Sequence, residues 1–237
     1  MTNMERIYTI PVNEAFEASA ADPSLGCPFC ALYSKLQSDE LDLILGASMM
    51  EPDVRIKTNE AGFCPDHFDM LFVRGKRLPL ALMLESHLDV VRKKLKPGAL
   101  SGLFASKSAA DAVKKVSEIN GSCYLCDRIG RNFTAMVETA ALLWQEDGEF
   151  RKKTEAQPYF CLPHYERLLT AAKERLGKGF TEFYSVVSKI EDRYLESLSE
   201  DVSAFCRSFD YRNTEEPLTE AEKTAPERTK KFLSSER

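Results

Sequence analysis

The chain has 237 residues, of which 43% are hydrophobic and 29% charged, and its formal net charge is −5. That composition excludes disorder along the whole chain, because 14 Phe and 8 Tyr side chains need a core. The acidic balance argues against a nucleic-acid partner. No apolar run reaches the ~18–20 residues of a membrane span, and residues 1–21 lack the apolar core of a signal peptide. We therefore expect a protein of the cytoplasm, where thiols stay reduced.

The first hundred residues read mainly as helices. Residues 7–10, Ile-Tyr-Thr-Ile, are the one segment that could form a short strand. Apolar residues at helical spacing predict a helix over residues 30–45, followed by a loop that contains Pro52. Pro65 is predicted to open a second helix in its first turn, and a third, amphipathic helix is predicted over residues 80–95.

The second half repeats this order after a stretch rich in small residues. A short helix is predicted over residues 111–119 and closes at Asn-Gly. Apolar stripes then predict helices over residues 125–144 and 165–176 and a long amphipathic helix over residues 183–209. The fold class we expect is therefore all-α.

Two short cysteine motifs occur twice each. A CxxC motif at residues 27–30 recurs at residues 123–126, which is 96 residues later. A CxxH motif at residues 64–67 recurs at residues 161–164, which is 97 residues later. Motifs of the same order and nearly constant offset indicate an internal duplication. Each repeat is predicted as a CxxC helix, a loop, a CxxH helix and a further amphipathic helix.

The duplication predicts how the chain is organised. We expect the first repeat, with the N-terminal stretch, over residues 1–98, a linker with a short helix over residues 99–121, and the second repeat over residues 122–209. The two repeats are expected to pack as one globular unit. A C-terminal tail over residues 210–237 follows. We expect residues 210–213 to pack against the helices and roughly the last 20 residues to be partly mobile.

The motifs point to two Cys3His metal sites. Zinc prefers four tetrahedral thiolate and imidazole ligands, and each repeat supplies three cysteines and one histidine. Each motif is predicted to lie where a helix begins, and the helix dipole stabilises thiolates there. We predict two zinc ions per chain, paired within repeats. The first site would use Cys27, Cys30, Cys64 and His67, and the second Cys123, Cys126, Cys161 and His164.

Alternatives remain open at this stage. The pairing could be exchanged, so that Cys27 and Cys30 meet Cys161 and His164. An iron–sulfur cluster could replace zinc, and metal-free thiol redox chemistry would use the CxxC pairs alone. Four protein ligands leave no open position for water, so we expect structural metal rather than catalytic metal.

Other residues have less specific predictions. His87 lies on an apolar helical stripe, which predicts a hydrogen-bonded histidine at the core boundary. Cys206 is expected to be a small buried hydrophobe. The basic triples at 92–94 and 151–153 are expected to be solvated faces. As an alternative, the basic loops at 55–58 and 151–154 could form paired anion sites.

The order of the motifs resembles the bacterial domain of unknown function 6062 family. The resemblance covers nearly the whole chain, and it implies an intracellular bacterial protein in which all eight ligand positions matter. It implies no reaction, because the family is uncharacterised. It rests on the segments 7–12, Cys27–Cys30, 62–67, 123–128, 160–164 and 209–213.

No catalytic set of residues is recognisable, so an enzyme is the less favoured reading. We expect a two-zinc binding or regulatory module with a protein or small-ligand partner and an unknown oligomeric state. One alternative is an enzyme or small-ligand sensor, with its pocket in the cleft between the repeats near His87 and the basic loops. The other alternative is a sensor that uses thiol and zinc redox chemistry.

Overall fold

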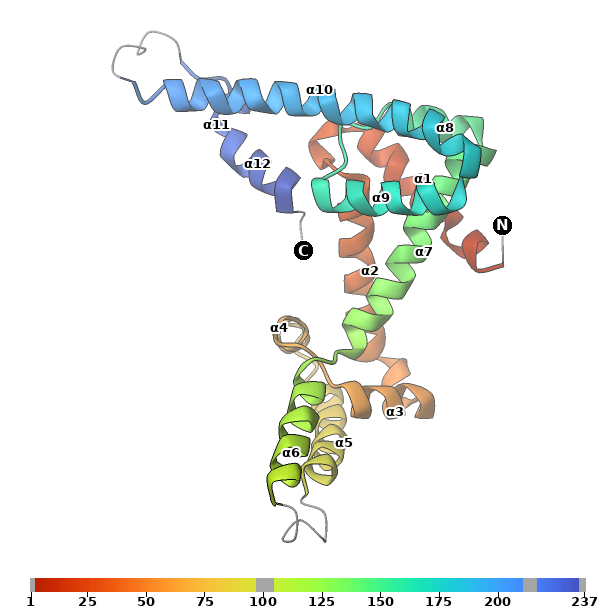
Figure 1. The fold of residues 1–237 in the computed structure, drawn as a ribbon, viewed down its shortest axis with the longest axis vertical. Helices are drawn as coiled ribbons and strands as arrows, with labels where there is room; N and C mark the ends of the chain where they lie inside the picture. The colour runs from red at the N-terminus through yellow and green to blue at the C-terminus, as the bar shows by residue number, and fades with distance from the viewer. Residues whose placement is uncertain (1–2, 97–104, 211–216, 235–237) are drawn as a thin grey trace. The chain divides into compact units, whose positions relative to one another are not determined.

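The computed structural model describes residues 3–96, 105–210 and 217–234, and every regular element within these ranges is a helix (Figure 1). The all-α prediction is therefore confirmed for the part of the chain that is described. The α-helices are α1 Asn3–Ala21, α2 Pro28–Ile44, α3 Pro52–Ala61, α4 Pro65–Val73, α5 Arg77–Leu95, α6 Ala105–Asn120, α7 Tyr124–Glu146, α8 Gly148–Glu155, α9 Leu162–Arg175, α10 Phe180–Arg207, α11 Glu220–Lys223 and α12 Ala225–Ser234. Short 3-10 helices lie at Pro23–Leu25, Ala47–Met50 and Gly177–Gly179.

The contacts divide the chain into two compact units. Unit 1 comprises residues 1–35 and 132–237, and unit 2 comprises residues 36–131. The helices α2 and α7 each contribute residues to both units. The division of the sequence into repeats, linker and tail remains a prediction, because the units follow spatial contacts rather than sequence similarity.

Unit 1 has an aromatic core built from widely separated segments. Phe16 of α1 lies with its ring centre 5.3 Å from that of Phe29 of α2 and 4.7 Å from that of Phe150 of α8. Phe29 also contacts Phe133 of α7 and Phe160, which precedes α9. All five side chains are almost completely buried. The core therefore surrounds the segments that carry the first CxxC and the second CxxH motif.

Unit 2 is held by the pair α3 and α5, which lie side by side, with α4 and α6 also against α5. Leu80 and Met83 of α5 and Leu71 of α4 are buried. Arg55 of α3 donates a hydrogen bond of 2.9 Å to the carbonyl of Leu82 on α5. These contacts fix the end of α3 and the start of α4, where the first CxxH motif lies.

The strand considered at residues 7–10 is wrong, because these residues lie inside α1. Among residues 7–21 of α1, the buried side chains are Val12, Phe16 and Ser19, at spacings of four and three residues. That spacing places them on one face of a helix. Packing of this face against the aromatic core outweighs the local strand propensity of Ile-Tyr-Thr-Ile.

The loops expected after the CxxC helices are also wrong, since each contains a helix, α3 or α8. Pro52 occupies the first turn of α3, with Asp53 beside it, which is favourable at a helix start. Asp147 caps α8 by accepting a 2.9 Å hydrogen bond from the amide of Glu149. With these additions the helix order α2 to α5 matches the order α7 to α10, which is consistent with the predicted duplication.

The tail differs from the prediction of partial mobility. Residues 220–223 and 225–234 form α11 and α12, and α12 packs against both α9 and α10. Ala225 and Phe232 of α12 are buried. These two apolar residues are seven positions apart, which is two helical turns, so they lie on the same face of α12. Because the rest of the segment is mostly charged, the sequence does not predict this buried face. The expected packing of residues 210–213 falls largely outside the described residues.

Candidate metal centres

Each of the four motifs places its two ligand residues at the start of a helix. Cys64 and Cys161 precede α4 and α9 in extended conformation, and the histidine three residues later lies in the first turn. Cys27 and Cys123 likewise precede α2 and α7, with the second cysteine three residues on. Residues three apart in a first turn share one side of the helix, so both ligand atoms can face one ion. The positive ends of the helix dipoles favour the thiolates.

The first cluster, called site 1, combines Cys27, Cys30, Cys161 and His164. The ring nitrogen Nδ1 of His164 lies 3.1 Å from Sγ of Cys161, 3.5 Å from Sγ of Cys30 and 3.8 Å from Sγ of Cys27. The sulfurs of Cys30 and Cys161 are 3.6 Å apart. All four residues are buried and belong to unit 1.

The second cluster, called site 2, combines Cys64, His67, Cys123 and Cys126. Nδ1 of His67 lies 3.2 Å from Sγ of Cys64 and 3.4 Å from each sulfur of Cys123 and Cys126. The sulfurs of Cys64 and Cys126 are 3.7 Å apart. These residues all belong to unit 2.

These spacings fit a single tetrahedral ion. With metal–sulfur bonds of about 2.3 Å and a metal–nitrogen bond of about 2.0 Å, tetrahedral angles place two sulfurs about 3.8 Å apart and sulfur and nitrogen about 3.5 Å apart. The measured separations of 3.1–3.8 Å lie close to these values in both clusters. Two Cys3His clusters that can each hold a metal ion are therefore present, with Nδ1 as the imidazole ligand.

The predicted pairing of ligands within each repeat is wrong, and the exchanged pairing is the one observed. The reason is the length of the helices. The 17 residues of α2 extend about 25 Å from the CxxC motif, whereas the 10 residues of α3 return at most about 15 Å. In the second repeat, 23 residues of α7 are followed by only 8 in α8. Because α3 and α8 are coiled into helices, the connections span less distance than loops of the same length would, which favours the exchanged pairing.

The two clusters differ in their exposure to solvent. In site 1 the largest exposed fraction is 8%, at Cys30. In site 2, Cys123 and His67 are buried, Cys64 is half-buried and Cys126 is exposed. Two sites with the same ligand types thus offer different access to their sulfur atoms.

Burial sets the protonation of the metal-free ligands. It raises the pKa of the Cys27 thiol well above its usual range, and the neighbouring thiols add to this effect. Burial also raises the pKa of Cys126 to about 12, with hydrogen bonds to Cys123 contributing. For His67, burial lowers the pKa and favours the neutral imidazole that metals bind. A metal ion must therefore displace the thiol protons when it binds.

The histidines are oriented by different neighbours. In site 1 the His164 ring lies against Phe133, with ring centres 5.0 Å apart, and against Phe29 at 6.1 Å. In site 2 the second ring nitrogen of His67 lies 3.4 Å from the side-chain amide of Gln37 on α2. With Nδ1 bound to a metal, Nε2 carries the ring proton and would donate a hydrogen bond to the side-chain amide oxygen of Gln37. No sequence pattern around Gln37 signals this role, so it is not among the predicted site residues.

His87 supports site 2 without belonging to it. Its Nδ1 lies 2.8 Å from the carbonyl oxygen of Asn59, so the prediction of a hydrogen-bonded boundary histidine is confirmed. Its ring also lies against Gly62, whose φ is +61°, and a Cβ there would be 2.7 Å from Nε2. The carbonyl of Gly62 in turn accepts a 3.0 Å hydrogen bond from the amide of Tyr124, at the start of α7. Gly62 thus links the two chain segments that form site 2.

The remaining candidate residues lie outside the clusters. Cys206 is exposed, so its prediction as a buried residue is wrong. Of the basic triple at 151–153, Lys152 is solvated, but Arg151 stacks on Trp144 at 4.3 Å and donates to that residue's carbonyl. Arg55 is likewise engaged, by the carbonyl of Leu82. These contacts account for the two arginines without an anion ligand.

No helix of the described segments has both the length and the apolar composition that a membrane span requires.

Comparison with known proteins gives a family and nothing finer. No curated protein matches the chain, and no solved structure matches it either. A family described as a family of unknown function, DUF6062, matches residues 3–237, which is essentially the whole chain, so the protein belongs to the DUF6062 family.

Proposed function

We propose that both clusters bind zinc and that the zinc ions are structural. The observation that carries this proposal is the spacing of the four donor atoms in each cluster, which suits one tetrahedral ion with thiolate and imidazole ligands. An iron–sulfur cluster is larger than a single ion and needs its ligand atoms further apart. Four protein ligands also occupy every tetrahedral position, which leaves none for a substrate or catalytic water.

The ions would join segments that are distant in the sequence. Site 1 links the start of α2 to the start of α9, and site 2 links the start of α4 to the start of α7. The exchange of motifs between two repeats further supports descent from a duplicated unit. Because zinc thiolate sites need reduced cysteines, we place the protein in the cytoplasm. The helical scaffold that results would act as a binding or regulatory module.

Elemental analysis of the purified protein tests this proposal. We expect two zinc ions per chain. Once a strong chelator has removed them, we expect the protein to show no cooperative unfolding transition, since metal binding is coupled to folding. Bound iron, or clearly less than one zinc per chain after expression in zinc-replete medium, would overturn the assignment.

The exposure of site 2 favours a second candidate function, a sensor of peroxides. The sulfurs of Cys64 and Cys126 are 3.7 Å apart, and Cys126 is exposed. Hydrogen peroxide would take two electrons from the two thiolates and, with two protons, form two water molecules, while a disulfide bond joins the sulfurs. Zinc would then leave because it has lost two ligands. Site 1 has the same ligand types but buried sulfurs.

Zinc release coupled to a chromogenic chelator tests this second candidate. We expect peroxide to release one zinc ion per chain well before the other, with a Cys64–Cys126 disulfide found by peptide mass spectrometry. The variant Cys206→Ser removes an exposed thiol outside both clusters and should leave this release unchanged. Release of both ions at one rate, or no release at all, would reject peroxide sensing and leave the zinc proposal intact.

A further inference from the structure

A cavity of about 650 Å³ lies beside site 1 in unit 1. Its lining combines the turn before α2 and the first turn of α2, the segment before α9, the helices α10 and α12, and Thr224 between α11 and α12, so it draws on both sequence repeats and on the tail. Cys27 and Cys30 form part of its wall, and His87 does not line it. The pocket expected near His87 is therefore not this one.

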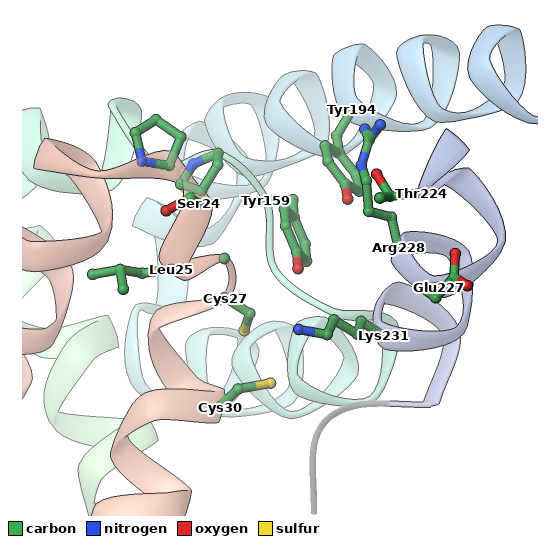
Figure 2. A pocket seen from close by; sticks show the side chains of 13 residues that line it. Ser24, Leu25, Cys27, Cys30, Tyr159, Tyr194, Thr224, Glu227, Arg228 and Lys231 are labelled. Carbon is green, nitrogen blue, oxygen red and sulfur yellow. The ribbon is translucent and has the colours of Figure 1, made fainter. Parts of the chain in front are cut away.

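The tail supplies the charged part of this wall. Figure 2 shows the side chain of Lys231 on α12 pointing toward the sulfurs of Cys27 and Cys30, with the Tyr159 hydroxyl group above them. Glu227 and Arg228, one turn earlier on α12, line the same cavity. Lys231 is thus the tail residue whose cation faces the thiol groups of site 1.

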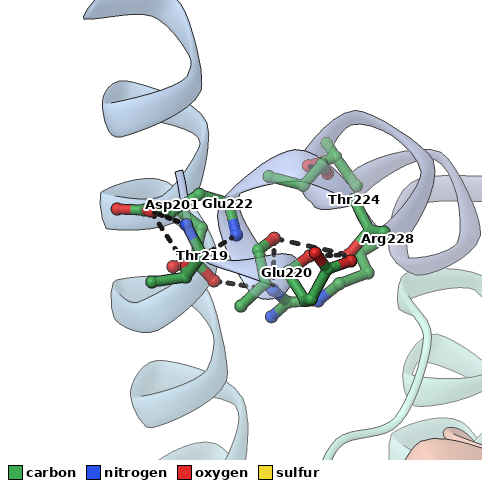
Figure 3. Close-up of polar contacts among 9 residues, drawn as sticks. Asp201, Thr219, Glu220, Glu222, Thr224 and Arg228 are labelled. Atoms are coloured by element: carbon green, nitrogen blue, oxygen red, sulfur yellow. Dashed lines mark hydrogen bonds and ion pairs between the residues drawn. The ribbon is translucent and has the colours of Figure 1, made fainter. Parts of the chain in front are cut away.

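The position of Lys231 is fixed by firm docking of α12. Phe232 is buried against the stacked rings of Tyr159 and Tyr194, whose centres are 4.0 Å apart. Arg228 forms a 2.6 Å ion pair with Asp201 of α10 and also donates to the carbonyl of Ala221 (Figure 3).

The segment before α12 is ordered by its own cap. Thr219 and Glu222 form a reciprocal capping box at the start of α11. The chain therefore enters α12 along a defined path, which adds to the docking of Arg228 and Phe232.

A cation at this position has a specific electrostatic effect. Zinc with three thiolates and a neutral imidazole carries a net charge of −1, and site 1 is enclosed by aromatic side chains, where charge is poorly screened. A lysine ammonium group that faces the sulfurs offsets the negative charge of the metal-bound state. Without the lysine the bound state is less stable, so such a lysine slows metal release.

We propose that α12 is the outer wall of metal site 1 and that Lys231 stabilises its metal-bound thiolates, so that docking of the tail controls metal exchange at this site. The inference rests on the proposed metal binding. It assigns a role to a segment that contributes no metal ligand.

The experiment compares metal transfer from the full-length, zinc-loaded protein to an excess of chelator. Lys231→Met removes the charge but keeps an unbranched side chain that suits a helix. We expect it to accelerate release of one of the two zinc ions by several-fold. Lys231→Arg keeps the charge and should stay near the rate of the unchanged protein. Lys230→Met makes the same charge change at the preceding position, which is exposed as Lys231 is but does not line the cavity, and it should have no effect.

The second zinc ion is an internal control, because site 2 lies in the other unit. Equal release rates for Lys231→Met and Lys230→Met would overturn the proposed role of Lys231. Acceleration of both ions together would also overturn it, since the effect would then be a general loss of stability. Failure of the underlying zinc proposal is distinguishable, because the protein would then hold no zinc before any chelator is added.

Discussion

Glu191 of α10 is a buried carboxylate with an incomplete set of partners. It is 4% exposed, and its Oε1 accepts a 2.7 Å hydrogen bond from the amide of Phe160, the residue before a site 1 ligand. Its Oε2 is buried without a hydrogen-bond partner. Burial raises the pKa of Glu191 to about 7, against the lowering effect of the Phe160 amide, and the charge of Asp192 raises it further.

The sign of the effect on stability follows from this raised pKa. Below the unfolded pKa of 4.5 the carboxyl is protonated in both states and costs nothing. As the pH rises toward 7, the unfolded chain loses the proton first, so folding becomes less favourable. Above pH 7 the full cost is present, and a pKa of about 7 in the folded protein against 4.5 in the unfolded chain corresponds to about 3 kcal/mol. Between pH 6 and pH 8 the cost grows by about 1 kcal/mol.

The variant Glu191→Gln removes this cost while keeping an acceptor for the Phe160 amide. We expect it to unfold in denaturant with a free energy up to about 3 kcal/mol above that of the unchanged protein at pH 8, and with a smaller excess at pH 6. Both proteins are compared zinc-loaded, so that the pH dependence of metal binding is common to both. Glu196→Gln, an exposed position on the same helix, is the matched control. A constant difference between pH 6 and 8, or a less stable Glu191→Gln at pH 8, would refute the reasoning.

Three further predictions concern the clusters and their supports. Cys30→Ala combined with Cys161→Ala removes two ligands from site 1 and should leave one zinc ion per chain by elemental analysis. Cys30→Ala combined with Cys64→Ala removes one ligand from each site and should leave none. The opposite result would support pairing within repeats. Gly62→Ala should cost about 1–3 kcal/mol in denaturant unfolding, because its φ is +61° and a Cβ would lie 2.7 Å from an imidazole nitrogen. Gly75→Ala, with φ +71° and open space around it, should cost less, and equal costs would show that the contact is unimportant. Zinc titration near pH 7 should release close to three protons per site, measured by calorimetry in buffers of different ionisation enthalpy; release of fewer than one would mean that the thiols are already ionised.

The sequence predicted the helices whose apolar residues recur at helical spacing, and it predicted the eight residues of the clusters. The signal was strong in both cases because it was periodic. A stripe such as that of α7 repeats every three to four residues, and the motifs repeat after 96 and 97 residues. The predictions that are wrong concern short segments, where a few residues determine the secondary structure. The strand considered at residues 7–10 was four residues long, and the helix that contains it is held by Phe16 against an aromatic core.

The pairing of ligands could not be read from spacing, because it depends on what joins the motifs. An extended connection spans the distance back to the CxxC motif more readily than a helix of the same number of residues does, so helical connections favour the exchanged pairing. Residues 52–61 carry a proline at their start and mostly polar side chains, so the sequence shows no apolar stripe that would predict α3. Lys231 was missed for a related reason. Its position depends on two buried side chains, Ala225 and Phe232, in an otherwise charged tail.

The exchanged pairing also means that all ligands of site 2 lie, in the sequence, between the two motifs that form site 1. Cys30 and Cys161 of site 1 are 131 residues apart, and site 2 joins Cys64 to Cys126, 62 residues apart, within that interval. During synthesis on a ribosome, all four ligands of site 2 are made before those of site 1 are complete, because Cys27 and Cys30 have no partners until the start of α9 has been made. Closing the inner site shortens the free chain between the outer ligands to about half, which lowers the entropic cost of the outer closure by about 0.6 kcal/mol. The first metal ion acquired would therefore prepare the chain for the second.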